Sequence, residues 1–318
     1  MSLPALLKHL RLPIIGSPMF IVSNPALVAA QCKAGVVGSF PALNARGEGT
    51  LNQWLTDLKT ELVADKAAGG NPAPFAVNQI VHPSNSRLAD DIKLCLQHEV
   101  PIFITSLQVP PKALIDGAHA YGGIVLHDVI SVRHAKKALE AGVDGLILVA
   151  AGAGGHAGKL SPFALVGEIR KFYDGLIILS GAIATGDAVL GAQAMGADLA
   201  YMGTRFICTT EANADAAYKQ GIINASANDV IYTNLFTGVH GNYLRQSIVT
   251  AGLDPDNLPV ADKTKMNFGS GGNSAAKAWK DIWGVGQGVG LIDDAPSTAE
   301  LVDHLEMEYK AARARLAL

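Results

Sequence analysis

The sequence predicts an α/β fold, a (β/α)8 TIM barrel with a C-terminal insertion or lid segment. Up to about Thr210, short apolar runs alternate with longer amphipathic stretches, as in successive βα units around a parallel sheet. Eight such runs can be counted, at intervals of about 20 to 35 residues that suit strand, loop and crossover helix. Eight strands favour a closed barrel, and a doubly wound open sheet is the alternative.

The expected strands are continuous apolar runs, the type found in parallel strands covered on both faces. In chain order they are Pro13–Met19, Gly35–Phe40, Phe75–Gln79, Ile102–Thr105, Gly123–His127, Gly145–Val149, Leu176–Ser180 and Leu199–Gly203. A glycine joint recurs ahead of three of them, at Gly35, Gly142 and Gly196. Glycine takes the left-handed conformation that ends a helix, so each joint predicts a helix end followed by a strand.

After about Thr210 this rhythm breaks, and we expect three regions. Residues 1–210 are the predicted barrel core, 211–275 a lid or insertion, and 276–318 a C-terminal segment that packs back on the barrel. The insertion ends in a flexible-looking stretch, Phe268–Asn273. An amphipathic closing helix is expected from about Ser297 to Leu316, because Thr298 and Glu300 favour helix initiation.

Composition indicates an ordinary globular protein. Of 318 residues 49% are hydrophobic, the formal net charge is −3, and no dense basic cluster suggests nucleic acid or an anionic membrane as partner. The start of the chain lacks a signal-peptide pattern and no apolar run nears 18 residues, so a cytoplasmic location is expected. The three cysteines, Cys32, Cys95 and Cys208, are without metal-type spacing, and we expect them reduced and buried, with no metal site. The oligomeric state stays open.

One histidine stands out. His156 lies in the glycine-rich turn Ala150–Gly158, directly after the apolar run expected to be the sixth strand. Glycines allow the backbone to approach a flat or anionic group closely, and an imidazole titrates near neutrality, which suits removal of a proton from carbon. The alternative is a histidine that merely caps the next helix.

A phosphate site is predicted where the last two strands end. Ser180, Gly181 and Ala182 follow the seventh run, and Gly203 and Thr204 follow the eighth. In such barrels a phosphate often lies between these two loops, held by backbone N–H groups, hydroxyls and a helix amino terminus. The alternative is a pair of tight turns without a ligand.

Dinucleotide and nucleoside-triphosphate loops are not supported. No Gly-x-Gly-x-x-Gly opens a first βα unit, and no Walker-type lysine is present. Gly284–Gly290 is glycine-rich but lies at the wrong end of the chain. Within it, Gln287 is an amide that could reach a ligand.

Taken together, these motifs resemble the FMN-dependent nitronate monooxygenases, formerly called 2-nitropropane dioxygenases, and the related NAD(P)H-dependent quinone and enoyl reductases. The matching motifs run in order over nearly the whole chain: Pro13–Met19, Phe75–Asn78, Gly154–Gly158, Ser180–Ala184, Met202–Phe206 and Gly286–Ile292. The ordered set is more specific than any single motif.

The resemblance implies a flavin site with His156 as the catalytic residue beside the reactive face of FMN. The cofactor-binding residues that it implies are Ser17, Pro18, Met19, Asn78, His127, Gly155, Ser180, Gly181, Ala182, Gly203, Thr204, Gln287 and Gly288. Asn78 would hydrogen-bond the flavin, since an amide offers both a donor and an acceptor.

Three positions depart from the family pattern. Ala182 replaces a glycine of the phosphate turn, Gly152 and Ala153 stand where an acidic residue is common, and Asp128 stands where some relatives have a lysine. The last change reverses a local charge.

The activity implied by the resemblance is oxidation of alkyl nitronates or nitroalkanes by oxygen to a carbonyl compound and nitrite. His156 would act as a base or would stabilise the bound anion. A first alternative is an NAD(P)H-dependent flavin oxidoreductase, a quinone or enoyl reductase, on the same scaffold. A second is a flavin-free barrel enzyme that binds a phosphate ligand.

Overall fold

The computed structural model describes residues 3–261 and 281–317. The predicted stretch Phe268–Asn273 lies outside these residues. Within them the three cysteines are buried and reduced, as expected. No helix of the described ranges is both long and apolar enough to cross a membrane.

The eight expected strands form one parallel sheet, which confirms the barrel. They are β1 (Ile14–Gly16), β2 (Gly38–Pro41), β3 (Phe75–Val81), β4 (Ile102–Leu107), β5 (Ile124–Val129), β6 (Gly145–Val149), β8 (Leu176–Ser180) and β9 (Leu199–Met202). Their order is β1-β9-β8-β6-β5-β4-β3-β2. The barrel closes between β1 and β2, where Gly16 N donates to Val37 O at 2.8 Å and Val37 N donates to Ile14 O at 3.1 Å.

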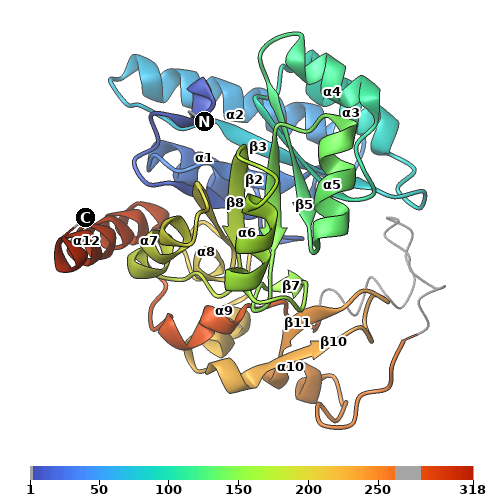
Figure 1. Ribbon diagram of the computed structural model, residues 1–318, viewed down its shortest axis with the longest axis vertical. Coiled ribbons are helices and arrows are strands. Elements are labelled where there is room, and N and C mark those ends of the chain that lie inside the picture. The colour runs from blue at the N-terminus through green and yellow to red at the C-terminus, as the bar shows by residue number, and fades with distance from the viewer. Residues whose placement is uncertain (1–2, 262–280, 318) are drawn as a thin grey trace.

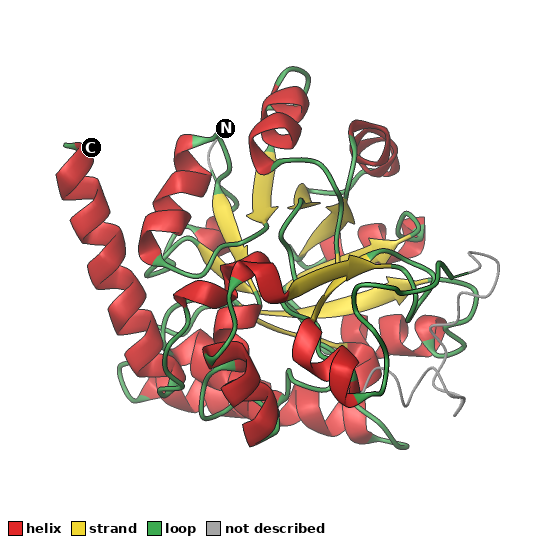
Figure 2. Ribbon diagram, turned by 90° about the horizontal axis from the view of Figure 1, so that it is seen from below, coloured by secondary structure: helices red, strands yellow, loops and turns green. Residues whose placement is uncertain are grey.

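Helices surround these strands on the outside (Figures 1 and 2). They are α1 (Pro25–Lys33), α2 (Thr50–Ala67), α3 (Leu88–Gln97), α4 (Lys112–His119), α5 (Val132–Ala141), α6 (Pro162–Arg170), α7 (Gly186–Ala194) and the short α8 (Thr204–Ile207), with 3-10 turns at Ala5–Leu7 and Ala42–Asn44. The glycine joints are confirmed, since φ is +89° at Gly35, +92° at Gly142 and +107° at Gly196.

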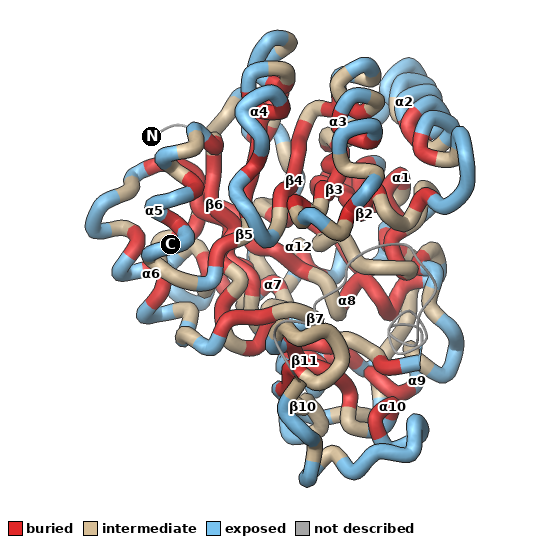
Figure 3. Tube along the Cα trace, turned by 90° about the vertical axis from the view of Figure 1, so that its right-hand side faces the viewer, coloured by how far each residue is buried: buried red, intermediate tan, exposed pale blue. Residues whose placement is uncertain are grey.

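The strands are the most deeply buried part of the molecule (Figure 3). Inside the barrel, alternate residues such as Ala76, Ile104, Leu126 and Ile178 pack into one apolar cluster. Because side chains alternate between the faces of a strand, the next inward positions on β3, β4 and β5 are polar, namely Asn78, Ser106 and Asp128. The apolar core therefore gives way to polar side chains at the carboxyl end of the barrel.

The described part of the insertion folds over this end. It contains α9 (Ala216–Ile223), a 3-10 turn (Ala227–Asp229), β10 (Val230–Thr233), β11 (Gly241–Leu244) and α10 (Arg245–Thr250). Strand β11 pairs with the two-residue strand β7 (Gly155–His156), so the sheet order is β10-β11-β7. The insertion is thus joined by backbone hydrogen bonding to the turn that carries the predicted catalytic histidine (Figure 1).

The C-terminal segment packs against the barrel. It forms a 3-10 turn (Gln287–Leu291) and then α12 (Thr298–Leu316), whose start is a capping box between Ser297 and Glu300. Leu301, Val302 and Leu305 of this helix pack in one cluster with Val189 of α7 and apolar residues of β1 and β9.

Candidate functional site

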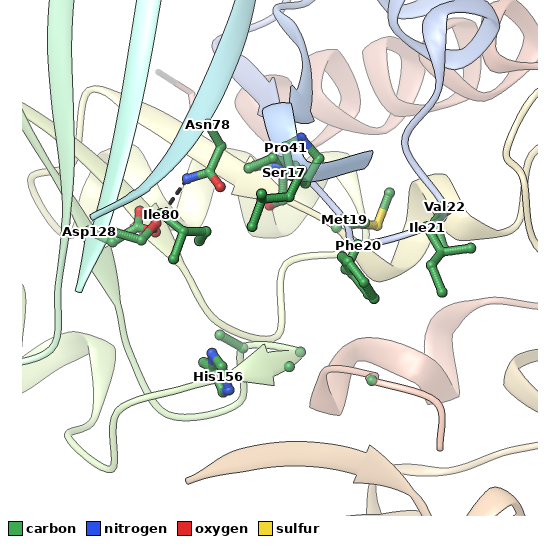
Figure 4. Close-up of a pocket in the computed structure, with 18 of the residues that line it drawn as sticks. Ser17, Met19, Phe20, Ile21, Val22, Pro41, Asn78, Ile80, Asp128 and His156 are labelled. Atoms are coloured by element: carbon green, nitrogen blue, oxygen red, sulfur yellow. Dashed lines mark hydrogen bonds between the residues drawn. The ribbon is translucent and has the colours of Figure 1, made fainter. Parts of the chain in front are cut away.

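A cavity of about 1530 Å³ lies at the carboxyl ends of the barrel strands, beneath the insertion. It exceeds the roughly 300–1,000 Å³ usual for one drug-sized ligand, so it has room for two ligands together. The predicted residues that line it are Ser17, Pro18, Met19, Asn78, Gly155, His156, Ser180, Gly181, Ala182, Gly203, Thr204 and Gly288. Figure 4 shows several of them around one space.

Two predicted residues do not line this cavity. His127 is 2% exposed, and its Nδ1 lies 2.8 Å from Thr105 Oγ1, on the opposite face of β5 from the barrel interior. Its neighbour Asp128 lines the cavity instead. Gln287 has an exposed side chain, while its amide N donates to Gly152 O at 2.9 Å. Thus Gln287 positions the loop, and the flanking Gly286 and Gly288 line the cavity.

The two glycine turns of the predicted phosphate site lie side by side at one end of the cavity. Gly181 has φ +136°, and a Cβ there would lie 2.6 Å from Ala151 O, so packing alone requires this glycine. At Gly203 a Cβ would make ordinary van der Waals contacts, the nearest at 3.5 Å from Ser17 Cβ, so packing alone does not require this glycine. The hydroxyl of Thr204 accepts from Gly286 N at 2.9 Å and ties the C-terminal segment to this rim.

The helix amino terminus contributes less to this site than the sequence suggests. Thr185 caps α7 by accepting from Ala188 N. However, Gly186 N donates to Glu308 Oε2 of α12 at 2.7 Å, so a carboxylate of the protein already binds the first amide of the helix. An anion in the cavity would therefore be held by the turns at Gly181–Ala184 and Gly203–Thr204 rather than by the helix end.

The floor of the cavity is a hydrogen-bonded chain across three strands. Asn78 Nδ2 donates to Ser106 Oγ at 2.9 Å, and Ser106 Oγ donates to Asp128 Oδ2 at 2.6 Å (Figure 4 shows Asn78 and Asp128). Within the described part of the chain, Asp128 Oδ1 and the hydroxyl of Tyr201 are enclosed without a hydrogen-bond partner. Both residues line the cavity. Burial raises the pKa of Asp128 to about 7, and hydrogen bonding from Ser106 opposes that rise.

The roof of the cavity carries His156. Its Nε2 lies 2.9 Å from Thr237 Oγ1 of the insertion, and Thr237 Oγ1 donates to Val239 O at 3.0 Å. Thr237 therefore links the imidazole ring to the backbone of the insertion. Desolvation lowers the pKa of His156 to about 4, which keeps the imidazole neutral at neutral pH.

Sequence reasoning missed three contributors to the site: Ser106, Tyr201 and Thr237. The period-2 alternation of β4 and β9 could have identified the first two, because inward positions near the carboxyl end of a strand reach the site. Thr237 lies in the insertion and left no comparable signal.

Sequence comparison supports the resemblance. The family model for nitronate monooxygenase matches residues 4–308. A protein named nitronate monooxygenase from Paraburkholderia phytofirmans is 29% identical over 346 aligned residues, covering 94% of this chain and 92% of its own length. One of the same name from Neurospora crassa is 27% identical, covering 93% and 89%.

Solved structures share the fold over nearly the whole chain. A nitroalkane oxidase from Streptomyces ansochromogenes has a TM-score of 0.80 at 24% identity, with 98% of this chain and 99% of that chain covered. FabK from Thermotoga maritima has a TM-score of 0.77 at 25% identity, with 98% and 96% covered. With a family model that spans nearly all of the described barrel, the chain belongs to the nitronate monooxygenase family.

Proposed function

We propose that this protein binds FMN and oxidises alkyl nitronates, or the nitroalkanes from which they form, with oxygen to a carbonyl compound and nitrite. The observation that carries the proposal is a neutral histidine, His156, held over a cavity large enough for a cofactor and a substrate. The names of the similar proteins from Paraburkholderia phytofirmans and Neurospora crassa support the same substrate class.

The residues present suit FMN. The turns at Gly181 and Gly203, which both line the cavity, would hold the phosphate. Ser17, Pro18 and Met19 would lie along the ring, and Asn78 would present only its amide oxygen to the cavity, because both protons of its amide are used on Ile104 O and Ser106 Oγ. FMN supplies the electron transfer that links nitronate to oxygen.

His156 performs the proton chemistry. Its imidazole would take the acidic C–H proton of a nitroalkane, leaving the nitronate anion and an imidazolium. The contact between Nε2 and Thr237 Oγ1 orients the ring for this step. The resulting imidazolium attracts the anion while it waits for oxidation.

The proposal is tested by following the flavin absorbance of the purified protein without oxygen, adding an alkyl nitronate and, separately, NADH or NADPH. Bleaching by nitronate alone, followed by nitrite release when oxygen is admitted, is the expected result. Rapid bleaching by NAD(P)H alone would assign the protein to the flavin reductases. Failure to bind FMN at all would leave a phosphate-ligand barrel enzyme.

A further inference from the structure

Two enclosed polar atoms on the cavity floor lack a partner among the residues that the structure describes. They are Asp128 Oδ1 on β5 and the hydroxyl of Tyr201 on β9, a residue only 7% exposed. A buried polar group left without a hydrogen bond costs about 1–3 kcal/mol. Since both residues line the cavity, a bound ligand is the partner that would remove this cost.

The direction of the neighbouring hydrogen bonds decides what these atoms can take. Asn78 Nδ2 donates to Ile104 O at 3.3 Å and to Ser106 Oγ, and Ser106 donates to Asp128 Oδ2. The chain of donors therefore runs toward the carboxyl group, which leaves Asp128 Oδ1 as an acceptor. Tyr201 supplies an O–H nearby, close enough for the Asp128 charge to raise the pKa of the phenol further.

An acceptor beside a donor matches a ligand edge in which an N–H adjoins a carbonyl. We propose that Asp128 and Tyr201 bind the imide edge of the FMN ring, with Asp128 Oδ1 accepting from ring N3–H and Tyr201 donating to an adjoining carbonyl oxygen. This inference rests on the proposed function, because FMN is the cofactor of that function. It gives a role to the aspartate at the position where some relatives have a lysine, a side chain that has no acceptor.

The test is a double-mutant cycle in which the Asp128 side chain and the N3–H of the flavin are removed singly and together. FMN and 3-methyl-FMN, which lacks N3–H, are titrated into flavin-stripped protein, and the dissociation constants are read from quenching of flavin fluorescence. A hydrogen bond to a charged group is worth about 1.5–3 kcal/mol, so methylation should weaken binding to the wild type by roughly ten- to a hundredfold. In Asp128→Ala the methylation penalty should fall below about threefold.

Matched variants distinguish loss of the hydrogen bond to N3–H from a general loss of flavin binding. Asp128→Asn keeps an oxygen acceptor and should keep most of the methylation penalty. Tyr201→Phe should weaken binding of both flavins by a similar factor. Asp174 is exposed and is not among the residues that line the cavity, so Asp174→Ala should bind both flavins like the wild type.

Each outcome has a distinct meaning. Equal methylation penalties in the wild type and in Asp128→Ala would overturn the inference while leaving FMN as the cofactor. Should Asp128→Ala not fold, an absent penalty in both the wild type and Asp128→Asn would overturn it equally. Lack of FMN binding by the wild type would remove the proposed function and this inference together. A methylation penalty that depends on Asp128 in a protein that does not oxidise nitronates would keep the inference and reject only the substrate.

Discussion

The floor of the cavity belongs to the closed barrel, whereas its roof belongs to a small sheet that the insertion completes. On the floor, Asn78, Ser106 and Asp128 stand on three adjacent strands of a sheet bonded on both sides. On the roof, His156 stands on a two-residue strand whose one neighbour is β11. The barrel thus fixes the floor, while the position of the proposed base depends on residues far along the chain.

The floor and the roof of the cavity also shift pKa values in opposite directions. Desolvation disfavours the charged form in both places, which lowers the pKa of His156 to about 4 and raises the pKa of Asp128 to about 7. At neutral pH the roof therefore offers a neutral base and the floor a carboxyl group close to its titration midpoint. Environments that separate two titratable groups in this way divide the work of handling protons between them.

The largest expected effect is on the roof. His156→Gln should reduce turnover of a nitroalkane by about 10²- to 10⁴-fold, the usual contribution of a general base, while FMN affinity stays within a few fold. Steady-state nitrite release measures the first and flavin fluorescence the second. His304→Gln, an exposed histidine on α12, is the control and should behave like the wild type. Wild-type turnover by His156→Gln would remove the histidine from the mechanism.

The next effect tests how the roof is held. A Cβ at Gly241 of β11 would lie 2.7 Å from Gly155 O and 2.9 Å from the hydroxyl of Tyr243, so Gly241→Ala must push β11 and β7 apart. Overpacking of this kind costs about 1–3 kcal/mol of stability.

Because the barrel strands are not touched, turnover should fall more than FMN affinity does. The control is Gly191→Ala on α7, where a Cβ meets no atom within 4 Å. Gly252→Ala in the insertion is unsuitable, because φ at Gly252 is +79° and an alanine there would strain the backbone. An equal loss of turnover and flavin affinity in Gly241→Ala would show that the two faces are not independent.

A third prediction uses the opposite pKa shifts, measured as the melting temperature of flavin-free protein. The pKa of Asp128 in the folded state lies above its ordinary value of 3.8, so the folded state binds more protons between about pH 4 and 7 and loses stability as pH rises. The melting temperature of Asp128→Asn, relative to that of the wild type, should therefore increase from pH 5 to pH 8.

The pKa of His156 in the folded state lies below its ordinary value of 6.5, so the unfolded state binds more protons between about pH 4 and 6.5. The wild type loses stability as pH falls through this window. The melting temperature of His156→Gln, relative to that of the wild type, should therefore increase from pH 7 to pH 4.5. Parallel pH profiles for the two variants would contradict the contrast between floor and roof.

The floor and the barrel were largely predictable, because they follow from local periodicity. Apolar runs mark the eight strands, and Gly35, Gly142 and Gly196 mark helix ends through a backbone conformation that only glycine adopts easily. At β5 the predicted residue, His127, lies on the face of the strand that points away from the cavity, and Asp128 lines the cavity instead. A strand places His127 and Asp128 on opposite sides, and the apolar neighbours Ile124 and Leu126 show that the even-numbered positions face inward.

The roof could not be predicted in the same way. Two residues, Gly155 and His156, are too few to show a strand period, and four helices (α6 to α9) and three strands (β8, β9 and β10) separate them in the chain from their partner β11. The contact of His156 with Thr237 depends on that pairing. Non-local contacts of this kind leave no pattern in one sequence.

The smallest expected effect lies at the rim of the floor, at Ala182. With φ +55° this alanine occupies the left-handed region, which costs a residue with a Cβ about 1–2 kcal/mol. Ala182→Gly removes that strain but gives the unfolded chain more freedom, worth about 0.4–1 kcal/mol. The net gain in the free energy of unfolding should stay below about 1.6 kcal/mol in a urea titration.

The neighbouring residue supplies the contrast. Gly181→Ala would put a Cβ 2.6 Å from Ala151 O, so it should destabilise the protein by more than Ala182→Gly stabilises it. If Ala182→Gly instead lowers stability, the packing of the methyl group outweighs the backbone strain. If Ala182→Gly lowers FMN affinity, the turn is strained until it holds a phosphate, and the rim belongs with the ligand rather than with the barrel.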